Sequence, residues 1–204
     1  MPKKRPVSEY VGGTLRKARI VSVATALFAS NGYRDAPLAS VAEAADLTLP
    51  GLLHHFPSKQ ELLLAVLQDR EQRDKALVAE AIRTHPDDVA ALLEALVANN
   101  AAAPEGTSFH TVISAEATSP SHPAHDFIVA RYARVRSALR RSIAKQSSAA
   151  GLSDEEIKAL AVISMAVMDG LQVQWLLNPE IDMVANFKVF GALLRRAVTA
   201  QDTR

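Results

Sequence analysis

Every strongly periodic segment of this 204-residue sequence spaces its apolar residues as a helix does. Between residues 15 and 30, for example, Ile20, Ala24 and Phe28 recur at the four-residue interval that places side chains on one face of a helix. We find no segment with the strict apolar–polar alternation of a half-buried strand. The sequence therefore predicts an all-α protein.

Capping residues and helix breakers divide the chain into about nine helices. The expected helices span residues 15–30, 38–45, 49–56, 58–85, 87–103, 109–117, 126–150, 153–178 and 182–198. Thr48 and Asp182 stand where a side-chain N-cap is expected, and Ser153 with Glu156 has the spacing of a capping box. Three short helices followed by longer ones predict two parts, divided inside or just before the helix that starts at Ser58.

Composition excludes several classes of protein. The chain is 49% hydrophobic and 22% charged, which is typical of a globular domain, and it has no cysteine for disulfides, thiolate zinc sites or nucleophilic catalysis. Polar residues such as Ser164 and Asp169 interrupt the apolar stretch 160–177, so a buried helix is expected there rather than a membrane span. No apolar segment follows the basic start, so we expect no secretory signal, no membrane partner and a cytoplasmic location.

Charge is unevenly distributed, although the whole chain carries a net charge of only +1. Residues 1–60 contain eight Lys and Arg against four Asp and Glu, a balance of +4, whereas the remainder has a balance of −3. A basic end on an acidic remainder is typical of a protein that touches a polyanion with that end. A solvated charged face is the alternative interpretation.

The two short helices at 38–45 and 49–56, joined by a tight turn, have the spacing of a helix-turn-helix. The segments 32–33, 41–45, 47–48 and especially 52–63 resemble the N-terminal domain of TetR-family transcriptional regulators. The remainder is similar to that family's helical ligand-binding and dimerisation domain. The resemblance implies a DNA-binding domain at 1–57, with a basic arm at 1–13, and a ligand-binding and dimerisation domain at 58–204.

A recognition helix at 49–56 must bury one stripe, which Leu52 and Phe56 supply. The residues left to face the major groove are Leu49, Pro50, Gly51, Leu53 and His54. The family usually has tyrosine where Leu53 stands and often a basic or polar residue where Leu49 stands. This surface therefore favours apolar contact with thymine methyls, helped by His54, over bidentate reading of guanine. The alternative for Leu53 is a half-buried position against the first helix.

Phosphate contacts are expected around the recognition helix. Thr48 and Ser58 stand at helix N-termini, which attract anions, and the resemblance implies a phosphate-binding role for Lys59. His55 either contacts the DNA backbone or packs as a hydrogen-bonded imidazole beneath the turn. Residues 3–5 either form an arm that reaches the minor groove or fray as a tail.

Asp169 is a carboxylate in the middle of an apolar helix, where it needs a partner. One interpretation places it in a pocket for a small-molecule effector. The other candidate residues of that pocket are His110, Glu116, Tyr132, Met165, Met168, Gln172 and Trp175. The alternative is an ion pair with an arginine of a neighbouring helix or subunit, with no ligand involved.

Motifs for catalysis are absent from the sequence, so we expect no enzyme, no catalytic residues and no cofactor. His122 and His125, with His110 and Glu116, offer a zinc interpretation. We prefer a polar, proline-containing loop, and we expect no metal site.

The function predicted from these features is that of a homodimeric, TetR-like repressor that binds a palindromic operator in double-stranded DNA and is released by an unidentified small molecule. The expected dimer interface consists of Phe187, Val189, Phe190, Leu193 and Leu194. A helical small-molecule or lipid-binding protein without DNA binding is the alternative, favoured by the apolar Leu49 and Leu53. A helical-bundle enzyme is the third interpretation.

Overall fold

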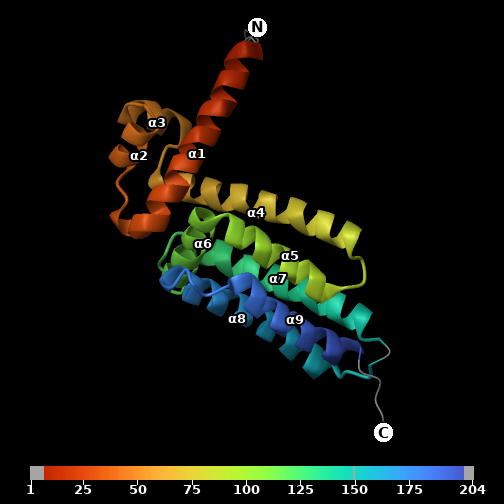
Figure 1. The fold of residues 1–204 in the computed structure, drawn as a ribbon. Helices are drawn as coiled ribbons and strands as arrows, with labels where there is room; N and C mark the ends of the chain where they lie inside the picture. Colours follow the sequence, from red (N-terminus) through yellow and green to blue (C-terminus); the bar gives the residue numbers. More distant parts are fainter. Residues whose placement is uncertain (1–6, 149, 200–204) are drawn as a thin grey trace.

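A computed structural model describes residues 7–148 and 150–199. In these ranges the chain forms nine α-helices and no strand, as the sequence predicts. The helices are α1 (Val7–Asp35), α2 (Leu38–Ala44), α3 (Leu49–His55), α4 (Lys59–Thr84), α5 (Val89–Ala102), α6 (Pro104–Glu116), α7 (His125–Gln146), α8 (Asp154–Leu177) and α9 (Met183–Thr199). Figure 1 shows α1, α2 and α3 at one end of the molecule and a layered body of the later helices beside them.

The core of the front end continues into the body. Ile20 and Phe28 of α1 and Leu52 of α3 are fully buried together with Leu62 of α4 and Phe109 of α6. The front core therefore extends past residue 57, where the sequence predicts the domain boundary. The two parts therefore share apolar side chains, and α4 and α6 pack directly on the core that holds the helix-turn-helix.

A second core lies between α4, α5, α7, α8 and α9. Phe187 and Leu194 of α9 are buried in this core, with 0% and 2% of their surfaces exposed. The expectation that these two residues form the dimer interface is therefore wrong, because their face of α9 is covered by α5 of the same chain. Phe190 is partly buried against the same core, and its ring lies 5.4 Å from that of Phe187.

The helix ends follow local chemistry. Thr48 and Asp182 accept the predicted capping bonds from Gly51 N (3.2 Å) and Ala185 N (2.8 Å), and Ser153 closes its predicted capping box. Two starts differ from prediction: α1 begins at Val7 instead of residue 15, so Gly12 and Gly13 are helical, and α6 begins at Pro104, a residue suited to a first turn, instead of residue 109. Residues 3–5, the proposed arm, lie outside the described ranges.

Helix α8 is less buried than the sequence predicts. Among the described helices, α8 is long and apolar enough to cross a membrane. Only 17% of its most apolar 18-residue stretch is buried inside the protein. This is weak evidence for a membrane span, because ordinary packed helices meet the same criterion. Helix α8 packs on α7 and α9 with one face and presents apolar side chains with another.

Candidate functional site

The turn between α2 and α3 sets the position of the recognition helix. Asp46 takes a left-handed backbone conformation (φ 55°), which aspartate tolerates better than most residues. Leu47 N then donates to Ala42 O over 2.8 Å, and the buried Leu52 and Phe56 fix α3 on the front core. The predicted buried stripe of α3 is therefore confirmed.

The opposite side of α3 is open to solvent. Pro50 and His54 are exposed, and Leu49 has 40% of its surface exposed. Gly51 and Leu53 are half-buried, and Leu53 is not among the described side chains that pack against the front core. The outward surface is thus mostly apolar, with one imidazole.

Cations of α1 lie beside this surface, which sequence reasoning did not anticipate. The pKa of His55 is lowered first by burial and then by the charges of His54, Lys17 and Arg16. Lys17 Nζ lies 5.8 Å from the centroid of the Phe56 ring at the end of α3. No local signal reveals this proximity, because it results from the packing of α1 on the helix-turn-helix.

Lys59 and Ser58 make contacts within the protein. Ser58 Oγ accepts a 3.1 Å hydrogen bond from Glu61 N and caps α4. Lys59 Nζ donates to Arg34 O over 2.9 Å and lies 4.7 Å from the centroid of the Tyr33 ring. Lys59 therefore joins α4 to the end of α1, and its contact with DNA phosphate remains a prediction.

The Glu116 carboxylate of α6 packs against the kink in α1 at Gly32. Gly32 has φ 72° and ψ 174°, and a Cβ at this position would collide with the Glu116 carboxylate. Glu116 Oε2 accepts a 3.1 Å hydrogen bond from Tyr33 N and lies 3.2 Å from His122 Nε2. The Tyr33 and His122 rings meet edge to face, with centroids 5.2 Å apart. The placement of Glu116 in a ligand pocket is therefore wrong, since its carboxylate belongs to the junction with α1.

The zinc interpretation finds no ligand set among the described residues, where no three His, Asp or Glu side chains are grouped to hold a metal. His122 is buried at the α1 junction, and His125 Nδ1 lies 2.8 Å from Ala117 O. His110 lines a cavity instead.

A cavity of about 420 Å³ lies between α4, α5, α7 and α8. Most of its wall is apolar, including Val78, Leu92, Leu96, Val135, Leu139 and Met165. The proposed ligand residues that line it are His110, Tyr132, Met165, Met168 and Asp169. Gln172 lines an adjoining cavity of about 250 Å³, together with Thr111 and Ser114.

Asp169 is held by a tyrosine rather than by an arginine. Tyr132 Oη donates to Asp169 Oδ2 over 2.8 Å, and no arginine of the described residues pairs with this carboxylate. Burial raises the pKa of Asp169, and burial beside this carboxylate raises the pKa of Tyr132 to about 12. His110 is buried against Tyr132, and burial, together with the charges of Arg70 and Arg131, holds its pKa well below the ordinary value. The alternative of an ion pair with an arginine of a neighbouring helix is therefore wrong for the described part of this chain, and a pairing of Asp169 with an arginine of a second subunit stays a prediction.

Trp175 lies outside both cavities and packs against the second core. It is six residues from Asp169, as Glu116 is from His110. Six residues turn a helix by about 240°, so both side chains leave the cavity face.

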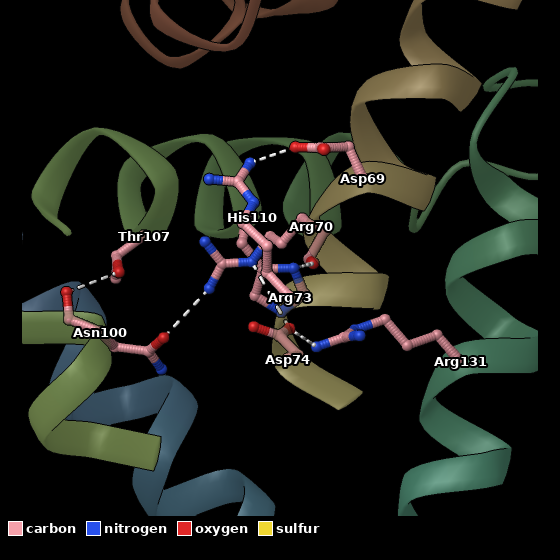
Figure 2. A network of polar contacts seen from close by, with 9 residues as sticks. Asp69, Arg70, Arg73, Asp74, Asn100, Thr107, His110 and Arg131 are labelled. Carbon is pink, nitrogen blue, oxygen red and sulfur yellow. Dashed lines mark hydrogen bonds and ion pairs between the residues drawn. The ribbon is translucent and has the colours of Figure 1, made fainter. Parts of the chain in front are cut away.

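Charged residues of α4 and α7 form one end of the cavity, and sequence reasoning missed them. Arg131 pairs with Asp74 over 2.8 Å and Arg134 pairs with Glu71 over 2.9 Å, so two ion pairs bridge the helices. Figure 2 shows Arg131 reaching Asp74 from α7 while Arg70 extends from α4 towards Asn100. The partners are more than fifty residues apart in the chain, so only the tertiary fold brings them together.

Apolar side chains line the outer faces of α8 and α9. The exposed members of this surface are Val162, Ile163, Val173, Leu177, Val189 and Leu193. Of the five predicted interface residues, Val189 (65% exposed) and Leu193 (57% exposed) belong to it. We call this set the outer apolar face.

Comparisons with known proteins match both parts of the chain. Residues 20–66 match the family model of bacterial regulatory proteins of the tetR family, and residues 86–201 match that of the C-terminal domain of BetI-type transcriptional repressors. The transcriptional activator FasR of Mycolicibacterium smegmatis is 36% identical over 36% of this chain and 33% of that protein. The transcriptional repressor KstR2 of Rhodococcus jostii is 32% identical over 45% of each chain. The chain thus spans less than half the length of these curated relatives where it matches them.

The fold also resembles solved structures. The transcriptional regulator FadR of Bacillus subtilis, in complex with stearoyl-CoA, superposes with a TM-score of 0.71 at 14% identity, over 88% of this chain and 98% of that one. At this identity the likeness concerns the fold alone. The match of the second family model covers more than half of the chain, and the helix-turn-helix at its front has the expected geometry. The protein therefore belongs to the TetR family of bacterial transcriptional regulators, which bind DNA through a helix-turn-helix and are not enzymes.

Proposed function

We propose that this regulator is a homodimeric repressor whose DNA binding is controlled by a small-molecule effector. The observation that carries the proposal is the cavity of about 420 Å³ in the body, whose walls are mostly apolar with a few convergent polar groups. Ligand sites typically measure roughly 300–1,000 Å³ and have this mixture of surfaces. Helix α4 lines the cavity and also contributes Leu62 to the front core. A ligand in the cavity would therefore shift α4 and change the position of the DNA-binding end.

DNA recognition is proposed for α3 and its surroundings. The residues assigned to it are Thr48, Leu49, Pro50, Gly51, Leu53, His54, His55, Ser58 and Lys59. Arg16 and Lys17 of α1 add positive charge beside them. Apolar contact with thymine methyls would read the sequence, while the cations and helix N-termini would contact phosphates. Because Lys59 Nζ also donates to Arg34 O, Lys59 would both fix α4 to the end of α1 and supply positive charge to the DNA.

The outer apolar face supports the proposal of a dimer. Val189 and Leu193 are one turn apart on α9 and exposed, and Val162 and Leu177 of α8 are exposed as well. Exposed apolar surfaces of this kind are typical of protein interfaces. A two-fold dimer presents two copies of α3 to the two halves of a palindromic operator.

Repression is the proposed direction, since the matching C-terminal model describes repressors, although one relative is named an activator and one a repressor. The FadR complex with stearoyl-CoA supports an effector with an apolar body. We also propose a cytoplasmic location, because bacterial DNA lies there. A small-molecule-binding protein without DNA binding is not adopted, because the family binds DNA.

Fluorescence anisotropy with DNA from upstream of the protein's own gene tests this function. We expect an affinity about a thousandfold or more above that for a scrambled duplex, and a steep loss of affinity with added salt. Equal affinity for both duplexes would contradict the proposal.

A further inference from the structure

Arg70 is a buried cation on the wall of the cavity with incomplete hydrogen bonding. Only 12% of its side chain is exposed, and its Nη2 donates to the neutral amide oxygen of Asn100 over 3.1 Å. Its buried Nε has no hydrogen-bond partner among the residues that the structure describes. Asp74 lies 3.8 Å away, too far for a hydrogen bond. A buried guanidinium normally has its N–H groups satisfied by acceptors, so Arg70 calls for another acceptor.

Residues of α5 and α6 surround the Arg70 guanidinium closely. A Cβ on Gly106 of α6 would lie 2.9 Å from Arg70 Nη1, so the guanidinium lies close against this glycine. Asn100 is itself buried, and Thr107 Oγ1 donates to its backbone oxygen over 2.8 Å. The guanidinium is therefore held in a fixed place at the cavity wall (Figure 2).

Positive charge exceeds negative charge at this end of the cavity. Four cations line it, Arg70, Lys75, Arg131 and Arg134. Three carboxylates line the same cavity, those of Glu71, Asp74 and Asp169. Asp74 lies within 4 Å of both Arg70 and Arg131, Glu71 pairs with both Lys75 and Arg134, and Asp169 accepts from Tyr132. Asp74 and Glu71 are thus each shared by two cations, and an anionic ligand would complete the balance.

We infer that the cavity binds an amphipathic anion, whose carboxylate or phosphate head group accepts hydrogen bonds from Arg70 and Arg131 and whose apolar body lies between α5, α7 and α8. The apolar wall formed by Leu92, Val135 and Met165 suits an alkyl or other hydrocarbon body. The planar guanidinium suits an oxyanion, to which it donates in pairs. This assignment replaces the cationic effector that Asp169 alone would favour.

The head group would compete with Asp74. Arg131 of α7 now pairs with Asp74 of α4, and an anion bound to Arg131 and Arg70 would take over that pairing. One of the two ion pairs that bridge α4 and α7 would then weaken. The effect of the anion on DNA binding rests on the proposed function. The preference of the cavity for an anion does not, and it is tested separately.

The ligand class is tested with four probes that share one chain and differ in the head group: dodecanoate, dodecyl phosphate, dodecanol and dodecyltrimethylammonium, each below its micelle concentration. Calorimetry on the full-length protein measures binding. We expect one of the two anions to bind about ten- to hundredfold more tightly than dodecanol, and the cation most weakly. The two anions distinguish a carboxylate source from a phosphate source.

Three variants assign the effect to residues. Arg70→Gln should weaken binding of the preferred anion about ten- to hundredfold and leave dodecanol binding unchanged. Asp74→Asn should strengthen binding of the anion, because a competing carboxylate is removed. Arg73→Gln is the matched control, since it removes the same charge from the same helix but from a surface pair with Asp69 outside the cavity. Arg73→Gln should change neither the affinity for the preferred anion nor that for dodecanol.

The outcomes separate the inference from the proposed function. Preference for dodecanol or the cation over both anions, or weaker anion binding by Asp74→Asn, would overturn the inference. Arg70-dependent binding of an anion without any effect on DNA affinity would support the inference and overturn the effector role. Release of DNA by dodecyltrimethylammonium but by neither anion would keep the effector role and overturn the inference.

Discussion

The hydroxyl of Tyr132 donates a 2.8 Å hydrogen bond to Asp169 Oδ2 and so joins α7 to α8 at the cavity wall. With its pKa raised to about 12, Tyr132 remains protonated and keeps donating across the physiological range. The carboxylate that receives this bond lies in an apolar setting that raises its own pKa. The bond therefore gives Asp169 a partner within the chain, and the next two predictions follow from it.

Asp169→Asn should change the free energy of unfolding by less than about 1 kcal/mol at neutral pH, because the amide oxygen still accepts from Tyr132 and a costly buried charge is removed. Urea unfolding followed by circular dichroism measures this value. A loss of about 3–5 kcal/mol would show that Asp169 forms a buried ion pair after all.

The pH dependence of the same variant has a predicted sign. Because the pKa of Asp169 is raised from 3.8 in the folded state, the folded protein holds this proton more tightly than the unfolded chain. Its contribution to stability is present below pH 3.8 and is lost as the pH rises through the raised value. The stability of Asp169→Asn relative to the wild type should therefore increase as the pH rises above 3.8. A difference that stays constant across this range would contradict the raised pKa.

Gly32→Ala should destabilise the protein by about 1–3 kcal/mol, because its backbone conformation is one that glycine alone adopts readily. The added Cβ would also displace the Glu116 carboxylate from Tyr33 N. Thermal unfolding compares this variant with Gly13→Ala, in which the new methyl group lies in a helix and meets no described atom within 4 Å. The control should be neutral or more stable by about 0.5–1 kcal/mol. Equal effects of the two changes would contradict the role assigned to the kink.

Charges on the outer apolar face should break the dimer. Val189→Asp combined with Leu193→Asp places two carboxylates on the exposed side of α9 and leaves the buried side intact. Sedimentation velocity should show a folded monomer. Val129→Asp is the control, because Val129 is exposed on α7 rather than on α8 or α9, and its replacement should leave a dimer. A double variant that sediments as the wild type does would exclude the outer apolar face as the interface.

Two variants separate phosphate contact from base reading. Lys17→Ala should weaken binding to all duplexes alike and reduce the salt slope by about one unit, since one phosphate contact is lost. His54→Ala should leave the salt slope unchanged and alter the preference among operator variants, because His54 is exposed on α3. Anisotropy titrations at several salt concentrations decide. If Lys17→Ala altered the sequence preference and His54→Ala reduced the salt slope, the roles assigned to the two residues would be wrong.

Local chemistry made most of the fold predictable. The caps at Thr48 and Asp182 and the box at Ser153 depend on residues three or fewer positions away, so the sequence displays them directly. The predicted start of α1 at residue 15, after Gly12 and Gly13, is wrong, because the helix that begins at Val7 includes both glycines. Propensity is a weak signal that the surrounding structure can override.

Long-range packing limited what could be predicted of the site. Helix α9 has apolar residues on two faces, and the sequence does not reveal that α5 covers Phe187 and Leu194 while Val189 stays exposed. In the same way, nothing local to Arg70 indicates that it lines a cavity with Arg131. Met165 was predictable as a neighbour of Asp169 because it lies one turn before it on the same helix.

The most direct test of the central claim measures the affinity of the protein for operator DNA with and without saturating dodecanoate, in the wild type and in Arg70→Gln. If the cavity controls DNA binding, the ligand should weaken the affinity of the wild type for DNA about five- to hundredfold. The same concentration should have little effect on Arg70→Gln. An affinity for operator DNA that is identical with and without bound dodecanoate in the wild type would contradict the claim.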